Sequence, residues 1–139
     1  MHKEIDANIK NNSALLQRLN QIIPEIVDAF DPEEIILYGS YARGENTAYS
    51  EIDIIIIAET ILRFQDRSLR ALEIISDDEI PVNPFVYTPE EFQQMLEKKE
   101  SYLLSALDES ILIWRKNKSC DVQDQLANSQ MESDYKKYL

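Results

Sequence analysis

The sequence predicts an α/β fold in which a small mixed β-sheet packs against helices. Segments with apolar residues at three- and four-residue spacing alternate with short aliphatic runs, so the 139 residues read as α-β-α-β-α-β-α-β. The composition, 44% apolar and 29% charged residues, is typical of a globular protein with one core. We expect one domain over residues 1–115, followed by a polar segment, 116–139, that is either a weak helix or a loose tail.

Two helices and two strands are predicted in the first half of the chain. Helical apolar spacing extends through the first thirty residues, where Asn11-Asn12-Ser13 can break or recap the helix and Pro24 can kink it. An aliphatic run then leads directly into Gly39, and a second aliphatic run follows a polar loop. The predicted elements are a helix at 3–30, a strand at 35–38, a short helix at 40–45 and a strand at 51–58.

The second half of the chain contains clear boundary signals. Pro84 cannot donate a ladder hydrogen bond, so its strand lies at a sheet edge or carries a bulge. Thr88, Pro89 and Glu91 form a capping box at the start of a helix. The predicted elements are a helix at 61–76, a strand at 80–87, a helix from residue 89, a helical turn at 102–107 and a strand at 111–114.

The helix at 61–76 carries both basic and apolar residues at helical spacing. We expect its basic residues Arg63, Arg67 and Arg70 to form a solvated face rather than a track for phosphates. The side expected to be buried carries Leu62, Leu69, Leu72, Ile74 and Ile75.

The net charge of −12 argues against several function classes. A protein that grips a nucleic-acid backbone needs a basic stripe, whereas here 26 acids outnumber 14 scattered bases, so long DNA or RNA is disfavoured as a direct partner. We expect no membrane association and a cytoplasmic location, because no apolar run approaches the length of a membrane span. The single Cys120 agrees with a reducing compartment. A serine hydrolase built on Ser40 is disfavoured, because the only histidine is His2.

The two glycines of the chain, Gly39 and Gly44, lie in one short stretch after a predicted buried strand. Glycine lets a backbone turn tightly or approach a ligand closely. Backbone N–H groups at Gly39 and Ser40, where a strand turns into a helix, can receive phosphate oxygens. Arg43, one helical turn onward, can add a bidentate contact to the same phosphate.

Two acids open the next predicted strand. Glu51 and Asp53 alternate along it, so their side chains point to the same face, about 7 Å apart at the backbone. Paired carboxylates are costly without a cation between them, and oxygen ligands of this kind suit Mg²⁺. Each feature alone is more often a plain turn, a solvated strand edge or a surface charge. Their combination after a buried strand indicates a nucleoside triphosphate held by the turn, with its metal held by the acids.

These residues resemble a known signature. Gly39-Ser40, ten further residues and Glu51-Ile52-Asp53 are similar to the Gly-Ser-x₁₀-Asp-x-Asp motif of the nucleotidyltransferase superfamily that includes DNA polymerase β and kanamycin nucleotidyltransferase. The longer strings 35–44 and 50–54 resemble its smallest branch, the minimal nucleotidyltransferases, and the resemblance extends over about residues 13–115. It implies the nucleotidyltransferase fold and transfer of a nucleoside monophosphate to an acceptor hydroxyl, with two Mg²⁺ ions and ATP.

By position, the resemblance implies that Gly39, Ser40 and Arg43 bind the nucleotide and that Glu51 and Asp53 are catalytic metal ligands. Two residues depart from the family pattern. Glu51 stands where the family has aspartate, which moves the carboxylate by about 1–1.5 Å, a displacement that can cost about 10²-fold in rate. Asn83 occupies the position of the third carboxylate, and an amide cannot accept a proton near neutral pH.

Two functions follow from the resemblance. The first is an enzyme that adenylylates a protein hydroxyl, as the antitoxin that neutralises a HEPN-type ribonuclease toxin. The second is a catalytically weakened nucleotidyltransferase fold that neutralises its partner by contact. Intact Gly39-Ser40, Arg43 and Asp53 favour the enzyme, whereas Glu51 and Asn83 favour the binding module. An antibiotic-modifying transferase is a third alternative, for which no substrate domain is visible in the sequence.

Overall fold

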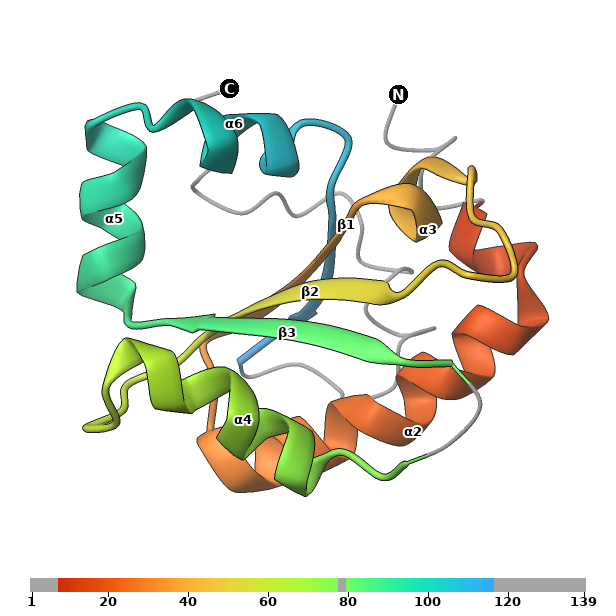
Figure 1. Ribbon diagram of the computed structural model, residues 1–139, viewed down its shortest axis with the longest axis horizontal. Helices are drawn as coiled ribbons and strands as arrows, with labels where there is room; N and C mark the ends of the chain where they lie inside the picture. Colours follow the sequence, from red (N-terminus) through yellow and green to blue (C-terminus); the bar gives the residue numbers. More distant parts are fainter. Residues whose placement is uncertain (1–7, 78–79, 117–139) are drawn as a thin grey trace.

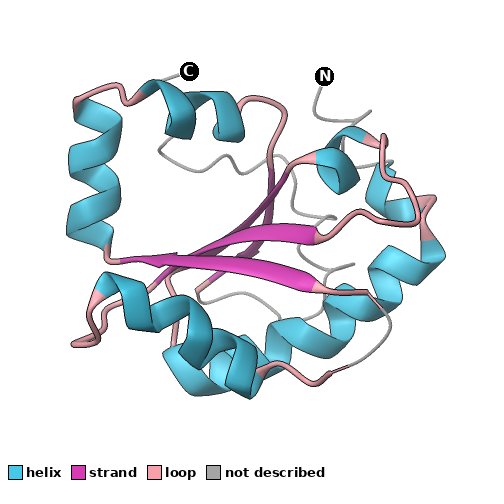
Figure 2. Ribbon diagram, viewed as in Figure 1, coloured by secondary structure: helices cyan, strands magenta, loops and turns pink. Residues whose placement is uncertain are grey.

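A four-stranded mixed sheet lies at the centre of the protein, with helices on both of its faces (Figures 1 and 2). The computed structural model describes residues 8–77 and 80–116. The elements are α2 (Ser13–Phe30), β1 (Glu34–Tyr38), α3 (Ser40–Arg43), β2 (Ile52–Ile57), α4 (Phe64–Ile74), β3 (Val82–Tyr87), α5 (Pro89–Glu97), α6 (Ser101–Leu107) and β4 (Ile111–Arg115). This arrangement confirms the predicted α/β class. Apart from Lys116, the predicted C-terminal segment lies outside the described residues.

The sheet has the strand order β3-β2-β1-β4. β1 is antiparallel to both of its neighbours, β2 and β4, whereas β2 and β3 are parallel. β3 is therefore an edge strand, which is one of the two alternatives that Pro84 left open, since a residue without an N–H is tolerated there. Within the described residues, no helix is long and apolar enough to cross a membrane.

The two faces of the sheet bury separate apolar clusters. Ile54 and Ile56 of β2 belong to the cluster on the α2 side, and Ile55 and Ile57 belong to the cluster that α5 and α6 cover. Successive strand residues point to opposite faces, so Asp53 lies on the same face as Ile55 and Ile57. In Figure 1, α2 and α4 lie on one side of the sheet, and α5 and α6 cover one end of the other side.

The N-terminal helical region is recapped at Asn12, which is one of the two alternatives that Asn11-Asn12-Ser13 left open. The Asn12 side chain accepts a hydrogen bond from Leu15 N at 3.1 Å and caps α2. Pro24 lies within α2. Arg18 of α2 is buried and donates to Ser76 O at 2.9 Å and to Ile80 O at 3.0 Å. These bonds fasten the connection between α4 and β3 to α2.

The prediction for the buried side of α4 is wrong at two positions. Leu69 is 65% exposed and Leu72 is 48% exposed. The side that faces the protein instead includes Arg67 and Ala71, which are both buried. The expected solvated face of basic residues is therefore also wrong for Arg67. A buried guanidinium is tolerated only when it is hydrogen-bonded, and here each of its three nitrogens donates to an acceptor.

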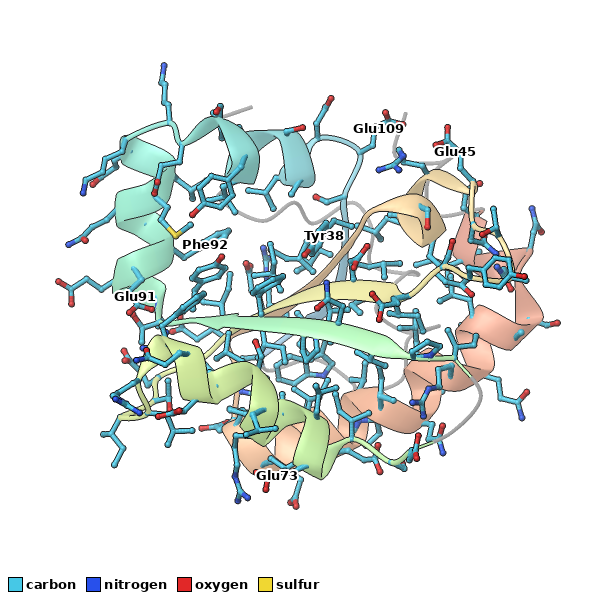
Figure 3. The ribbon with its side chains drawn as sticks, in the orientation of Figure 1. Tyr38, Glu45, Glu73, Glu91, Phe92 and Glu109 are labelled. Carbon is cyan, nitrogen blue, oxygen red and sulfur yellow. The ribbon has the colours of Figure 1, made fainter. Side chains whose placement is uncertain are left out.

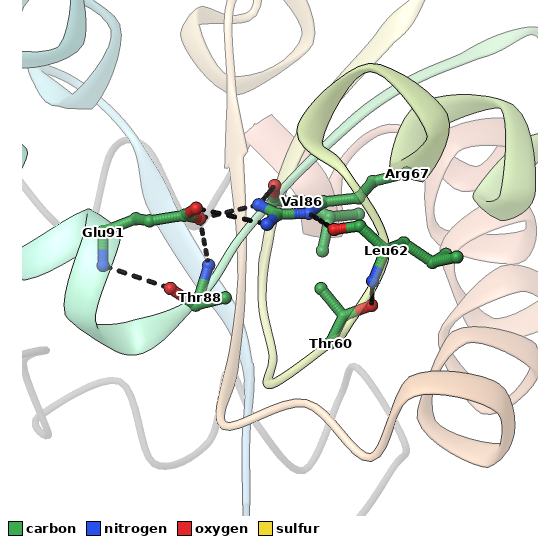
Figure 4. Close-up of polar contacts among 6 residues, drawn as sticks. All are labelled: Thr60, Leu62, Arg67, Val86, Thr88 and Glu91. Carbon is green, nitrogen blue, oxygen red and sulfur yellow. Dashed lines mark hydrogen bonds and ion pairs between the residues drawn. The ribbon is translucent and has the colours of Figure 1, made fainter.

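Arg67 connects α4, the end of β3 and the start of α5 (Figure 4). Its Nε donates to Leu62 O at 3.0 Å, and its Nη1 donates to Val86 O at 3.1 Å. Nη1 and Nη2 also donate to the two carboxylate oxygens of Glu91 at 2.6 and 3.1 Å. The same carboxylate accepts from Thr88 N at 2.8 Å, while Thr88 Oγ1 accepts from Glu91 N, which confirms the predicted capping box.

The Glu91 carboxylate should make stability depend on acid pH. Its hydrogen bonds with Arg67 lower the pKa of Glu91 below its usual range. The contribution of Glu91 to the free energy of unfolding is therefore present above the unfolded-state pKa of its carboxyl and is lost as pH falls through the folded-state pKa. We expect wild type to lose more free energy of unfolding than Glu91→Gln between about pH 6 and pH 3 in urea titrations. Parallel losses in the two proteins would contradict this assignment.

Candidate active site

The turn after β1 has a backbone that requires glycine. Gly39 has φ +79°, in the region that side chains other than glycine rarely adopt, and it leads directly into α3. A Cβ built at this position would lie 2.4 Å from Asp53 Oδ2, closer than any real contact. The Gly39 backbone therefore lies directly against the Asp53 carboxylate.

The strand register places three polar side chains side by side at this end of the sheet. Asp53 of β2 is paired with Tyr38 at the end of β1 and with Asn83 at the start of β3. The Asn83 side chain donates from Nδ2 to Asp53 Oδ1 at 3.1 Å. One carboxylate oxygen of Asp53 thus accepts from Asn83, and the other faces Gly39.

Glu51 lies just before β2 and is exposed, whereas Asp53 is half-buried. The described residues contain no group of three or more His, Cys, Asp or Glu side chains arranged to hold a metal ion. The candidate donors are therefore the carboxylates of Asp53, at the turn, and Glu51, two residues before it, with the Asn83 amide. This set fits one Mg²⁺ that takes its other ligands from phosphate and water. It does not fit a pair of ions that share three carboxylates.

A serine pair joins the turn to the loop before β2. Ser40 Oγ donates to Ser50 Oγ at 3.1 Å, and Ser50 Oγ accepts from Thr47 N at 2.9 Å. The ten residues that separate Ser40 from Glu51 thus bring the chain back to the turn, where Ser50 contacts Ser40. Sequence reasoning gave Ser50 no role, although its position directly before Glu51 was a usable signal.

Arg43 and Gly44 form the end of α3. Arg43 is exposed, and its Nε contacts Glu45 Oε1 at 3.0 Å. An exposed pair of this kind contributes little to stability, so a phosphate can displace Glu45 at small cost. Gly44 ends α3 with φ +73° and packs against Asn8, whose Nδ2 donates to Ala42 O at 3.0 Å. The second glycine is thus explained by packing within the protein.

Tyr38 is a site residue that sequence reasoning missed. It lies in the middle of the molecule over the sheet (Figure 3), next to Asp53 in the register. Burial raises the pKa of the Tyr38 hydroxyl well above its ordinary value, and the neighbouring Asp53 adds to the rise. The phenol therefore stays protonated at neutral pH and can donate a hydrogen bond. Its position directly before Gly39 was the only available sequence signal.

A hollow of about 290 Å³ lies at the other end of the same sheet face. Tyr87, which forms part of its wall, pairs with Ile57, four residues along β2 from Asp53, or about 13 Å. The Tyr87 ring stacks on Phe64 with 5.4 Å between centroids. The other residues that line the hollow are Glu91, Gln94, Met95, Lys98, Glu100 and Tyr102.

Comparison with known proteins identifies the family and the fold. The family model of the nucleotidyltransferase domain matches residues 18–113. The crystal structure of a candidate nucleotidyltransferase from Sulfolobus solfataricus aligns with a TM-score of 0.54 at 19% sequence identity, over 78% of this chain and 87% of that chain. At this identity the likeness shows the fold alone. None of the curated proteins matches the chain. The predicted nucleotidyltransferase fold is confirmed.

The contact between Gly39 and Asp53 can be tested with a double-mutant cycle. We expect Gly39→Ala to lower the free energy of unfolding by about 1–3 kcal/mol through backbone strain alone. The clash with the Asp53 carboxylate adds to that loss, and Asp53→Ala should remove the added part. Gly44→Ala is the control, because it also places a side chain at a positive φ, in the αL conformation, but meets Asn8 and not Asp53, so Asp53→Ala should leave its cost unchanged. Urea titrations that give the same cost for Gly39→Ala with and without Asp53 would show that the two residues do not touch.

Proposed function

This chain belongs to the nucleotidyltransferase domain family, and we propose that it is a Mg²⁺-dependent enzyme that transfers AMP from ATP to a protein hydroxyl. The contact of the Asp53 carboxylate with the Gly39 turn is the observation that supports this proposal most strongly. It brings a potential metal ligand against a backbone suited to phosphate. A nucleotide bound at the turn would thus have its phosphates beside Asp53.

In this proposal, the turn and the acids bind different parts of the nucleotide. The backbone at Gly39 and Ser40, together with the Arg43 guanidinium, holds the outgoing phosphates. Glu51 and Asp53 would hold Mg²⁺, which when bound neutralises charge on the phosphates during an in-line displacement. The hydrogen bond from Asn83 keeps the Asp53 carboxylate oriented, with its second oxygen toward the turn. The neighbouring Tyr38 supplies a protonated phenol close to that carboxylate.

We propose that the acceptor is a HEPN-type toxin and that this chain is its cytoplasmic antitoxin. The resemblance to the minimal nucleotidyltransferases supports this partner. The charge of the chain adds a condition, because a protein of net charge −12 favours a partner with a basic surface. The hollow beside Tyr87, on the same face as Asp53, gives an acceptor protein a second contact point along β3.

A binding module is the second candidate, and the contact between Asn83 and Asp53 favours it. This contact occupies one oxygen of Asp53 with an amide that cannot take the acceptor proton. Glu51 is exposed and precedes the strand, so it is held less firmly than Asp53. In this alternative the fold binds nucleotide and partner without transfer.

Removing the Asp53 carboxylate should separate the two candidates. We expect wild type to transfer labelled AMP from ATP to a purified HEPN-type protein in the presence of Mg²⁺. We expect Asp53→Ala to lower that transfer by 10²-fold or more, because displaced catalytic groups have effects of about this size. Mass spectrometry of the partner measures the product. Transfer that persists in Asp53→Ala would show that the metal site is elsewhere, and tight partner binding with no transfer by wild type would leave the binding module.

Restoring a carboxylate at position 83 should increase transfer. A positioned general base contributes about 10²–10⁴-fold, so we expect Asn83→Asp to raise the rate by about tenfold or more. Asn83→Ala is the control, since it removes the hydrogen bond to Asp53 without adding a base. Single-turnover rates with labelled ATP make the comparison. A rate for Asn83→Asp no higher than that of Asn83→Ala would contradict a missing base.

A further inference from the structure

Exposed apolar side chains gather on one segment of the protein. Of the six large hydrophobic residues exposed among those the structure describes, four lie between positions 61 and 72. A cluster of this kind on a protein surface commonly marks an interface. The four are Ile61 (103% exposed), Phe64 (45%), Leu69 (65%) and Leu72 (48%).

Leu69 lies at the centre of the outer face of α4. The buried side of this helix passes through Arg67 and Ala71. At 100° per residue, Leu69 is nearly opposite these two, and Leu72 and Glu73 lie on either side of it. Figure 3 shows Glu73 pointing away from the body of the protein. The outer face of α4 thus has an apolar centre with charged residues along one border.

The charged residues of this border alternate in sign. Arg63 and Asp66 are in contact at 3.0 Å, and Arg70 and Glu73 are in contact at 3.9 Å. Both pairs are exposed and therefore weak, so their members can exchange partners at little cost. The border has no net charge, although the whole chain carries −12. Two copies of the chain can therefore approach through this face with less repulsion than the net charge of the chain implies.

The order of these charges is self-complementary. Positions 63 and 73 are symmetric about position 68, and so are positions 66 and 70. When a second α4 lies antiparallel on the first, Arg63 therefore faces Glu73 of the other copy, and Asp66 faces Arg70. Opposite charges meet at all four places, and the two copies of Leu69 meet near the centre. A two-fold interface requires this kind of match, since each copy presents the same surface.

We propose that α4 is the contact between two copies of this chain, packed antiparallel about a two-fold axis near Leu69. Leu69 and Leu72 of both copies form the apolar centre, and the flanking charges set the antiparallel orientation. On the inner side of α4, Ala71 and the C-cap residue Ile75 belong to the apolar cluster on the α2 side of the sheet. This side is opposite the face with Asp53. The dimer therefore leaves both candidate active sites open.

Sedimentation equilibrium of the purified chain tests the apolar centre of this contact. At about 150 mM salt, where long-range repulsion is screened, wild type should form a concentration-dependent dimer. Leu69→Ser with Leu72→Ser should raise its Kd at least tenfold without unfolding the protein, because both side chains are exposed. Tyr49→Ser is the matched control, since Tyr49 is 94% exposed and outside α4. A monomer at all concentrations up to several hundred micromolar, or a dimer that is indifferent to the double substitution, would overturn the proposal.

Charge exchange tests the orientation of the two helices. Arg63→Glu alone and Glu73→Arg alone each place like charges opposite one another twice in the dimer, so each should raise the Kd several-fold. The combined variant restores opposite charges between the copies and should return the Kd toward that of wild type. A combined variant that dimerises no better than the single variants would exclude the antiparallel pairing. A stable complex with another protein through α4, in place of self-association, would equally overturn it.

Discussion

The candidate site depends on the missing side chain at Gly39. With no Cβ there, the chain leaves β1 in a left-handed conformation and its backbone rests against the Asp53 carboxylate. Asn83 holds the same carboxylate from the opposite neighbour strand. Asp53 is therefore placed by the pairing of three adjacent strands and not by a flexible loop. This placement keeps a negative group directly beside the turn on which a phosphate is proposed to bind.

The buried guanidinium of Arg67 sets the orientation of α4. Burying Arg67 is costly unless its guanidinium is hydrogen-bonded, and two main-chain carbonyls and the Glu91 carboxylate accept four hydrogen bonds from its three nitrogens. This network orients α4 so that Arg67 faces inward. Leu69 and Leu72 consequently face outward. α4 thus exposes apolar side chains because its opposite side carries Arg67, which is paired with Glu91.

The candidate active site and the proposed contact between copies therefore lie on opposite sides of the sheet. One carries Asp53, Asn83 and Tyr38, with the aromatic hollow at its far end. The other is covered by α2 and α4 (Figure 1), and the outer surface of α4 is the proposed contact between copies. Nucleotide chemistry and self-association would then use surfaces that do not compete. An acidic chain organised in this way can present its site to a basic partner while dimeric.

The sequence was sufficient to predict the α/β order and the capping box at Thr88, to restrict the strand with Pro84 to a sheet edge or a bulge, and to mark residues 11–13 as a break or a new cap in the first helix. Each of these depends on residues close together in the chain, so spacing and residue type suffice. The Gly39-Ser40 and Glu51-Asp53 motif was readable for the same reason. The inward position of Arg67, the bond from Asn83 to Asp53 and the location of Tyr38 in the site could be known only from the folded chain. These depend on partners 15 to 30 residues away, and helical or strand periodicity contains no information about such contacts.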